Sequence, residues 1–492
     1  MNILLVYPET PTTFWSFKNA LRFISKRSSE PPLGLITIAA MLPENWNRRL
    51  IDTNVTRLSD QDIKWADLVF LSGMDLHRVS FVSIVARCKS HGKKIVGGGP
   101  FCSMHHSEIE GVDFFVLNEA EITLPQFIAD FQEGKAKKIY ETNLFSEIGD
   151  TPVPQWDLLD LAEYAVMDIQ YSRGCPFSCD FCSVTALFGH KPRCKSTPQL
   201  TAELDALYQA GWRGKVFVVD DNFIGNKRKL KEDLLPGLIE WSRSRGNPFL
   251  FSSEVSINLA DDEELIDAMV AARFEMVFMG IETPDQDSLN ECGKVQNQGR
   301  DMVESVKLLQ RKGLRVTAGF IVGFDNDQPD IFDRQIGFIQ KSGIVTAMVG
   351  LLNAQKGTRL FERLSAEDRI LKIPSGDNMD GVLNFIPKLS SSELIGGYQR
   401  LLKTIYSQQN YFERVKTYLS EFQSPDRDVP KDIKSDIVTL LRAMWHIGIL
   451  EKGSKFFWKL MFYVLYNRPQ AFAEAVRMSI YGYHFRRVVS SI

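Results

Sequence analysis

The chain has 492 residues, of which 44% are apolar and 24% are charged, and its formal net charge is −3. This length exceeds that of one ordinary core, so it predicts two or three domains in a soluble globular protein. The slightly negative charge gives no whole-chain case for nucleic-acid binding, and we expect no nucleic-acid partner. No apolar run in the sequence approaches the roughly 18 residues that span a bilayer.

The N-terminal segment, residues 1–8, lacks a basic stretch and a cleavage site, and it predicts a buried strand rather than a signal peptide. The seven cysteines form an odd and clustered set, which argues against a disulfide framework. We therefore expect a cytoplasmic protein in which some of the cysteines bind metal.

Residues 1–140 alternate short apolar runs with helical patterns, for example at 80–90 and 121–132. Because the runs are apolar on both faces, this alternation predicts a doubly wound parallel sheet. Gly97, Gly98 and Gly99 follow the fourth strand, at the sheet edge where ligands bind, and glycine lets a backbone approach a ligand closely. The predicted strands are residues 3–7, 49–52, 68–72, 94–97 and 114–117.

Residues 141–160 predict a linker, since Pro152 and Pro154 stand there among acidic residues. Residues 161–370 contain six predicted strands, and a helix is expected after each strand except the last. Such units predict a partial (β/α)6 barrel, whose active site lies at the carboxyl ends of the strands. The predicted strands are 166–171, 215–219, 249–254, 276–281, 315–322 and 347–352; the predicted helices are 198–210, 227–244, 262–272, 300–312 and 328–342.

Residues 371–492 predict a mainly helical region, with helices at 391–419, 430–449, 455–465 and 469–478. From Lys431 to the end, ten Lys and Arg residues accompany four Asp and Glu residues, so this tail is basic. The aromatic run 455–466, flanked by lysines, fits an interfacial helix or the wall of a site for a greasy substrate. It also fits an ordinary core helix, which the lack of a clear polar face favours.

Three cysteines, Cys175, Cys179 and Cys182, follow the first predicted barrel strand with the spacing C-x3-C-x2-C. Three thiolates at this spacing can hold three irons of a cubane [4Fe-4S] cluster and leave the fourth iron open to a ligand. The alternative is a structural zinc site completed by Cys194 or His190. Structural zinc usually takes two paired ligand sets, and only one compact set exists here, so the cluster is the favoured interpretation.

The segment around these cysteines resembles the radical S-adenosylmethionine superfamily, in which an aromatic residue precedes the third cysteine, as Phe181 does here. The resemblance implies that the open iron binds the amino and carboxylate groups of S-adenosylmethionine. It also implies reductive cleavage to methionine and a 5′-deoxyadenosyl radical, with electrons from an external donor such as flavodoxin or ferredoxin.

The ends of the second and third barrel strands carry further residues of this resemblance. Asp220, Asp221 and Asn222 stand where the family contacts the methionine amino group, and the cobalamin-dependent branch commonly reads Asp-Asp-Asn-Phe there. Glu254 ends the third strand, where a polar residue often contacts the ribose. The alternative for such carboxylates is a helix N-cap, which the helix dipole favours.

The fourth and fifth barrel strands match the family more weakly. Glu282 lies in Gly280-Ile281-Glu282-Thr283, which resembles another family motif. Gly319 and Gly323 lie in a strand that resembles the one near the adenine. These glycines can also serve only close strand packing.

The N-terminal domain resembles the cobalamin-binding domain that precedes the barrel in one branch of the superfamily. The matching residues are Pro31 to Leu35 opening a helix, Ser72 after the third strand, Gly97, Gly98 and Gly99 after the fourth, and Asn118-Glu119-Ala120-Glu121, where relatives read Gly-Glu-Gly-Glu. The resemblance implies a bound cobalamin. The alternative is a domain that kept the fold and lost the cofactor.

A histidine ligand to cobalt is not expected, because the Asp-x-His-x-x-Gly motif of some cobalamin proteins is absent after the first strand. His77 lies after the third strand and is interpreted as a polar residue at a helix start. Cys102 could face a bound corrin, and Cys194 could face substrate.

The whole chain resembles the branch that includes hopanoid methylases and archaeal lipid-ring synthases. That resemblance implies cobalamin-dependent C-methylation of an unactivated carbon in a small molecule or a lipid, with peripheral membrane contact as an option. It assigns no catalytic residue beyond the cofactor sites. The alternatives are radical cyclisation or oxidation without methyl transfer, and a non-catalytic cobalamin or iron–sulfur sensor.

Overall fold

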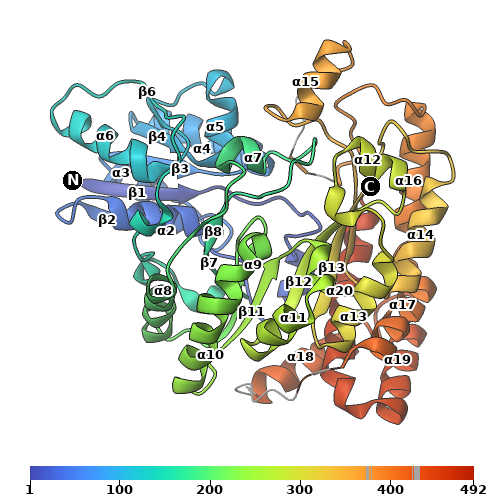
Figure 1. The fold of residues 1–492 in the computed structure, drawn as a ribbon. Coiled ribbons are helices and arrows are strands. Elements are labelled where there is room, and N and C mark those ends of the chain that lie inside the picture. The colour runs from blue at the N-terminus through green and yellow to red at the C-terminus, as the bar shows by residue number, and fades with distance from the viewer. Residues whose placement is uncertain (373–375, 378, 424, 426–432) are drawn as a thin grey trace.

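The computed structural model describes residues 1–372, 376–377, 379–423, 425 and 433–492 (Figure 1). Two parallel sheets follow one another along the chain, and helices of the C-terminal region close the second one. This arrangement confirms the predicted α/β fold class with a helical C-terminal region. The domain boundaries near residues 140, 160 and 370 stay predictions.

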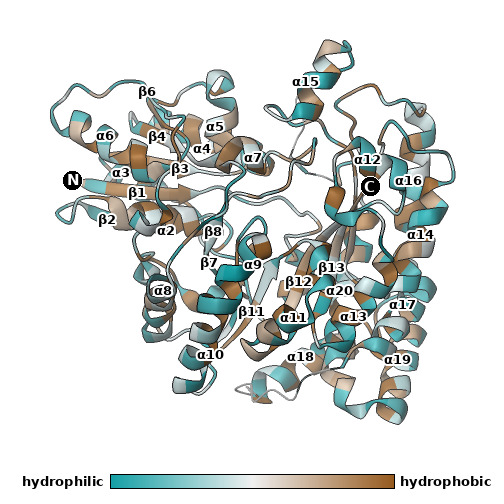
Figure 2. Cartoon of the chain, viewed as in Figure 1, coloured by the Kyte–Doolittle hydropathy of each residue, from teal (hydrophilic) through white to brown (hydrophobic). Residues whose placement is uncertain are grey.

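The N-terminal sheet has six parallel strands in the order β2-β1-β3-β4-β5-β6. Alternate residues of β1 enter two different cores, with Ile3 and Leu5 on one face and Leu4 and Val6 on the other. Figure 2 shows β1 brown along most of its length because both faces are covered by helices. The strands are β1 (Asn2–Tyr7), β2 (Asn47–Asp52), β3 (Leu68–Ser72), β4 (Lys94–Gly98), β5 (Phe114–Val116) and β6 (Ile139–Tyr140).

Helices on the two faces of this sheet are α2 (Leu33–Met41), α3 (Asp60–Trp65), α4 (Arg78–Ser90), α5 (Gly99–His105) and α6 (Ala120–Gln132). The two-residue strand β6 was not predicted, because a pair of residues before a linker carries no periodic pattern. Otherwise the five predicted strands and the doubly wound sheet are confirmed.

The second sheet also has six parallel strands, in the sequential order β14-β13-β12-β11-β10-β7. Since β7 and β14 are edge strands, the barrel is open, which confirms the predicted partial (β/α)6 barrel. The strands are β7 (Met167–Ile169), β10 (Gly214–Val218), β11 (Phe249–Glu254), β12 (Phe274–Glu282), β13 (Arg315–Val322) and β14 (Ala347–Leu351).

Each barrel strand leads into a helix, including the last, after which no helix had been expected: α15 (Arg359–Ala366) follows β14 and is capped by Thr358. The others are α8 (Thr197–Gln209), α9 (Lys227–Lys229) with α10 (Leu235–Ser244), α11 (Glu263–Ala271), α12 (Gln286–Glu291) with α13 (Met302–Arg311), and α14 (Ile331–Ser342). A π turn at Leu230–Leu234 interrupts the helix predicted at 227–244. It precedes Pro236, which has no N–H to donate to the preceding turn.

The C-terminal region departs most from prediction at two helices. The helix predicted at 391–419 is two helices, α16 (Ser391–Ile405) and α17 (Gln408–Glu421), because the Ser407 hydroxyl accepts from the Asn410 N–H and starts a new helix. The helix predicted at 469–478 is α20 (Phe472–Val489), which runs eleven residues further. α19 (Ser454–Asn467) agrees with prediction. α18 (Ile433–His446) ends three residues before the predicted end at 449, and residues 430–432 lie outside the described part.

The extension of α20 is explained by burial of its second half. Phe485 stacks on Phe14 from the N-terminal segment, with ring centroids 4.1 Å apart, and the His484 ring lies 2.9 Å from the Phe14 carbonyl oxygen. Burial lowers the pKa of His484 to about 4. Sequence preferences at Tyr481–Phe485 do not mark a helix, so long-range packing decides the structure there. Within the described ranges, no helix is long and apolar enough to cross a membrane.

A buried ion-pair network joins α20 to the barrel. Arg315 on β13 contacts Glu275 on β12 at 3.1 Å and Glu474 on α20 at 3.2 Å. Although burial raises the pKa of Glu474, Arg315 and Arg477 hold it below its usual range. Because α20 lies behind β13 (Figure 1), this network fixes the helix that closes the open barrel.

The variant Glu474→Ala removes one of the two carboxylates that face the buried Arg315 guanidinium. We expect a loss of about 3 kcal/mol in the free energy of unfolding, because a buried charge without its partner is costly. Urea denaturation followed by tryptophan fluorescence measures this loss. Glu304→Ala breaks an exposed pair with Arg311 and, as the control, should cost under about 1 kcal/mol. Equal losses in both variants would contradict the role given to the network.

Candidate active site

The three cysteines lie on one loop at the carboxyl end of β7. This loop is closed at its base by a short antiparallel hairpin of β8 (Ser172–Arg173) and β9 (Arg193–Cys194). Gly174 adopts φ +95°, and a Cβ there would lie 2.8 Å from the Lys191 carbonyl oxygen. Only glycine fits this turn without strain, so the loop geometry begins at Gly174.

Each cysteine sulfur has an N–H donor beside it. The Phe177 and Val184 backbone N–H groups donate to the Cys175 and Cys182 sulfurs, and the Gln296 Nε2 lies 3.9 Å from the Cys179 Sγ. Burial raises the pKa of all three thiols, that of Cys182 to about 12. Thiolates in such a buried place need donors or cations nearby, and this loop supplies the donors.

A buried lysine, Lys294, supplies positive charge beside the sulfurs. Its Nζ lies 2.6 Å from the Glu282 carboxylate, and although burial lowers the lysine pKa, Glu282 and Cys179 together raise it above its usual value. Glu282 adopts φ +63° at the end of β12, and the Asn297 Nδ2 bonds the Gly280 and Ile281 carbonyls on that strand. No feature of the sequence around Lys294 marked it, because the approach to the cysteines is a tertiary one.

The donor set fits a cubane cluster better than a single ion. Within the described part of the chain, no three His, Cys, Asp or Glu side chains converge closely enough to hold one metal ion. The ligands of a zinc ion all meet at one atom, whereas a cubane takes one sulfur per iron, so its three sulfurs lie farther apart around the cluster. Of the two residues considered as a fourth zinc ligand, His190 contacts the Ser178 hydroxyl at 3.3 Å, and Cys194 lies on β9, where it pairs with Ser172 of β8.

The three polar residues after β10 point in different directions. Asp220 accepts from the Tyr171 N–H at 2.8 Å and from the Ser172 hydroxyl, so it is buried against the base of the cysteine loop. Asn222 accepts from the Ser256 N–H at 3.2 Å and is also buried. Asp221 is partly exposed and lies 3.4 Å from the Gly174 N–H. Of the three, Asp221 therefore has the carboxylate that remains accessible to a ligand.

Glu254, Phe181 and the two glycines lie around the same end of the barrel. Burial, and then the Asp221 carboxylate, raise the pKa of Glu254 to about 8. The Phe181 ring packs on Phe324, and the Lys294 ammonium lies 5.9 Å from the Phe181 ring centre. Gly323 ends β13 with φ +110°, whereas Gly319 lies inside β13, where a Cβ would be 3.1 Å from the Phe278 ring. Gly319 is thus required for packing within the barrel.

The carboxyl edge of the N-terminal sheet has no room for side chains at the predicted glycines. A Cβ at Gly99 would lie 2.2 Å from the Ser72 Oγ, and one at Gly98 would lie 3.0 Å from the Val116 carbonyl oxygen. Gly97 faces inward, where its Cβ would meet the Cys102 sulfur at 3.1 Å. Atoms of the domain itself therefore require glycine at these three positions. The carboxyl edge of an open parallel sheet is where ligands bind, so Ser72 and these glycines lie where a corrin would be held.

Two residues considered for the cofactor face elsewhere. Cys102 is fully buried in the core of the N-terminal domain, so the expectation that it could face a corrin is wrong. His77 accepts from the Met74 N–H through Nδ1 at 3.0 Å, and its Nε2 lies 3.0 Å from the Thr10 hydroxyl. Both ring nitrogens have partners, and burial lowers the pKa of His77 to about 4, so His77 has a structural role.

Ion pairs tie the cysteine hairpin to the N-terminal domain. Arg193 on β9 contacts Glu119 at 2.8 Å, and Arg173 on β8 contacts Glu121 at 2.8 Å and Glu119 at 3.7 Å. Asn118, which replaces the first glycine of the family motif, adopts φ +61°, a conformation that asparagine tolerates. We call these four charged residues the interdomain clamp. The two glutamates match the family motif, whereas no sequence pattern marks their arginine partners.

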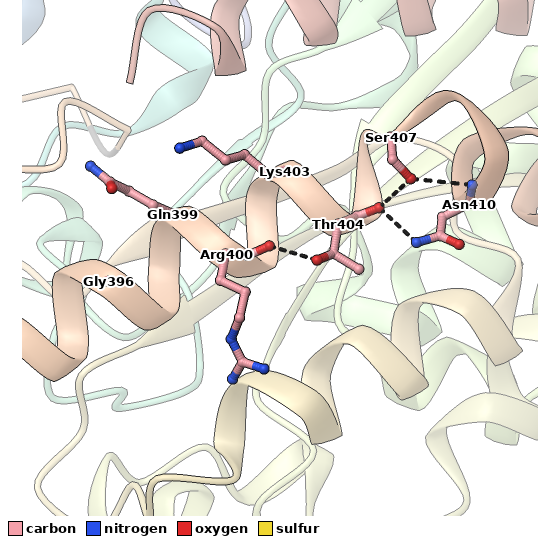
Figure 3. A pocket seen from close by; sticks show the side chains of 7 residues that line it. All are labelled: Gly396, Gln399, Arg400, Lys403, Thr404, Ser407 and Asn410. Atoms are coloured by element: carbon pink, nitrogen blue, oxygen red, sulfur yellow. Dashed lines mark hydrogen bonds between the residues drawn. The ribbon is translucent and has the colours of Figure 1, made fainter.

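A hollow on the C-terminal helices carries no comparable chemistry. Figure 3 shows that its polar groups bond to one another: the Thr404 hydroxyl donates to the Arg400 carbonyl, and the Ser407 hydroxyl and Asn410 amide donate to the Thr404 carbonyl. These are the bonds of the α16–α17 junction. We therefore place the active site at the cysteine loop.

The variant Glu119→Gln weakens the interdomain clamp at its most buried carboxylate. Because breaking a buried pair costs a few kcal/mol, we expect iron loss from the reconstituted protein to a chelator to be on the order of tenfold faster. Anaerobic absorption spectroscopy follows this loss, and circular dichroism checks the fold. Glu9→Gln, at an exposed pair with Lys18, is the control. Unchanged iron loss in Glu119→Gln would contradict the link between clamp and cluster.

The raised pKa of Glu254 predicts a pH dependence of stability. Above about pH 5 the unfolded glutamate is ionised, whereas the folded carboxyl keeps its proton up to about pH 8. The folded state thus binds more protons, so stability falls as pH rises across this window. Glu254→Gln should remove this decline and melt at a higher temperature than the parent at pH 8, but not at pH 5. Parallel melting curves for both proteins at every pH would contradict the assignment.

Comparison with known proteins agrees with the geometry. The model of the Radical SAM superfamily matches residues 169–334, and a domain of unknown function (DUF4070) matches residues 358–492. An uncharacterized methyltransferase of Synechocystis sp. is 38% identical over 490 residues, which cover 99% of this chain and 91% of that protein. Hopanoid C-2 methylase of Rhodopseudomonas palustris is 31% identical over 469 residues, which cover 93% of this chain and 88% of that protein.

Two solved structures share the fold over the whole chain. The cobalamin-dependent S-adenosylmethionine radical enzyme OxsB, with aqua-cobalamin and S-adenosylmethionine bound, gives a TM-score of 0.64 at 14% identity and is covered over 80% of its length. The radical S-adenosylmethionine methyltransferase TsrM of Kitasatospora setae, with cobalamin and a [4Fe-4S] cluster bound, gives 0.62 at 13% identity and is covered over 99%.

The two sequence relatives settle the family, since both align over nearly the full chain. The predicted enzyme class, its [4Fe-4S] cluster and its use of S-adenosylmethionine are confirmed by that family. Such an enzyme acts on a small molecule and needs an electron donor. The chain belongs to the radical S-adenosylmethionine family, within the branch of cobalamin-domain methyltransferases that contains hopanoid C-2 methylase.

Proposed function

We propose that the protein is a cobalamin-dependent radical methyltransferase that methylates an unactivated carbon of an apolar substrate. The observation that carries this proposal is the interdomain clamp, because it joins the cysteine hairpin to the helix α6 that begins beside the open edge of the N-terminal sheet. The cluster site and the carboxyl edge of the N-terminal sheet are thereby fixed relative to one another, as a reaction that uses two cofactors on one carbon requires.

When bound, the cluster supplies the electron that cleaves S-adenosylmethionine, and cobalamin carries the methyl group. Cys175, Cys179 and Cys182 would hold the cluster, and Ser72 and Gly99 would border the corrin. The partly exposed Asp221 carboxylate suits the amino group of S-adenosylmethionine. Glu254 keeps its proton at neutral pH, so it can donate a hydrogen bond to a ribose oxygen without adding charge.

Four partly exposed aromatic rings support an apolar substrate. Trp15 lies edge-on to Phe278 of β12, with ring centroids 5.2 Å apart, and Phe17 lies 5.1 Å from Tyr481 of α20. Trp15 and Phe17 themselves are 6.3 Å apart. Rings from the N-terminal segment, the barrel and the last helix therefore meet beside the barrel interior, which suits a greasy ring system or chain.

The remaining expectations for partners are part of this proposal. A flavodoxin or ferredoxin would deliver the electron in the cytoplasm, and an apolar substrate would bring the enzyme to a membrane surface. The relative named hopanoid C-2 methylase supports methylation over cyclisation or oxidation.

Anaerobic reconstitution with S-adenosylmethionine labelled in its methyl group tests the reaction. Extracts of cells that lack the gene serve as substrate source, and mass spectrometry reads the label in the product fraction. We expect 5′-deoxyadenosine together with a labelled apolar product, and Cys175→Ala should abolish both. Formation of 5′-deoxyadenosine with an unlabelled altered product would establish cyclisation or oxidation instead. Absence of 5′-deoxyadenosine from the reconstituted parent would favour a sensor.

A further inference from the structure

Helix α18 turns an apolar face to the solvent. Its exposed apolar side chains lie on one side of the helix, while Ala443 is buried on the other. A helix on a globular protein normally presents polar residues outward, so this face is inverted. These side chains, each 42–65% exposed, are Ile433, Ile437, Val438, Leu441 and Trp445.

Helix α19 also exposes apolar side chains and lies next to the end of α18. The Trp458 Nε1 donates to the Gly448 carbonyl just beyond α18 at 2.8 Å, so the two helices meet there. Figure 1 shows both helices at the same end of the molecule, the lower end in that view. Phe462, Leu465 and Tyr466 on α19 are 67%, 54% and 90% exposed. We call the exposed side chains of α18 and α19 the C-terminal apolar face.

Lysines lie within and around the C-terminal apolar face. Lys434 shares the exposed side of α18, and Lys455 and Lys459 flank the Phe456 ring at 5.3 and 5.6 Å. Within the described ranges, neither these three nor Lys452 has a carboxylate at ion-pairing distance. By contrast, two arginines of α20 form ion pairs, Arg477 with Glu474 at 2.8 Å and Arg486 with Glu451 at 2.9 Å. Asp436 on α18 is also exposed, and the four lysines outnumber this carboxylate, so the surface carries net positive charge.

We propose that the C-terminal apolar face docks the enzyme on a lipid bilayer that contains anionic headgroups. Apolar and aromatic side chains would enter the boundary between headgroups and acyl chains, while long lysine side chains reach the phosphates. This inference rests on the proposed function in one respect: docking on a bilayer would bring the enzyme to an apolar substrate dissolved there.

Charge decides between a bilayer and a second copy of the chain. In a twofold dimer through the C-terminal apolar face, the four lysines of one copy would face those of the other. Like charges across an interface oppose association, and the described residues of this face offer no acidic patch to neutralise them. An anionic bilayer supplies the missing negative charge and covers the apolar side chains at once.

Co-sedimentation of the full-length reconstituted enzyme with vesicles tests the docking. The probes are vesicles of phosphatidylcholine alone and of phosphatidylcholine with 30% phosphatidylglycerol. We expect binding to the anionic vesicles at least tenfold stronger than to the neutral ones, and weaker binding at high salt.

Two double variants separate the apolar and the electrostatic contributions. Ile437→Ser with Leu441→Ser removes apolar area, and Lys455→Gln with Lys459→Gln removes two charges; each should weaken anionic-vesicle binding roughly tenfold or more. The control is Val79→Ser with Val82→Ser on α4, two valines that are 84% and 50% exposed on the N-terminal domain. The control should bind as the parent does.

The outcomes distinguish this inference from the proposed function. Equal binding to neutral and anionic vesicles, absence of binding, or equal loss in the α4 control would overturn the docking. So would a dimer in sedimentation velocity that dissociates in Ile437→Ser with Leu441→Ser. Labelled methyl transfer without vesicle binding would leave the proposed function standing alone, and vesicle binding without 5′-deoxyadenosine would leave the docking standing alone.

Discussion

The interdomain clamp is the constraint on which the active site depends. The cysteine loop is a long excursion from β7 with little regular structure, and its base is a hairpin of only two residues per strand. Arg173 and Arg193 at that base reach Glu119 and Glu121, so the N-terminal domain holds a loop that belongs to the barrel. A cluster ligated by this loop keeps its distance from the N-terminal sheet because charged side chains bridge the two domains in a nearly dry place.

The polar residues at the carboxyl ends of the barrel strands have different roles. The side-chain oxygens of Asp220 and Asn222 accept hydrogen bonds from the backbone of neighbouring loops, whereas Asp221 and Glu254 remain accessible. Burial raises the pKa of Asp221 to about 6 and that of Glu254 to about 8, so the acidic end of the barrel is less charged than its sequence suggests. Lys294 adds a buried cation on the side of the sulfurs. The protonation state around the cysteine loop is therefore set by the burial and partners of each of these side chains.

The strands were predictable from the sequence because parallel strands covered on both faces read as continuous apolar runs, as in β1 and β13. The cysteine triad was predictable because its spacing is local. Lys294 and the clamp arginines were not, since each meets its partners across the chain and no local pattern records that. The predicted helix ends were most clearly wrong at two places. At Ser407 one hydroxyl starts a new helix, and at Tyr481–Phe485 packing against distant residues extends the last helix. The aspartates after β10 match a motif, but the motif does not say which carboxylate stays free.

The stacking of Phe14 on Phe485 constrains the order in which the parts of the protein can fold during synthesis. Residues near the start of the chain line the barrel only once the last helix is present, and 470 residues separate the two contacting atoms of Phe14 and His484. On the ribosome, the N-terminal sheet can close early from its own strands, whereas the segment after β1 waits with its aromatic rings uncovered until synthesis is nearly finished. We therefore expect chaperones to bind mainly the short segment that follows β1.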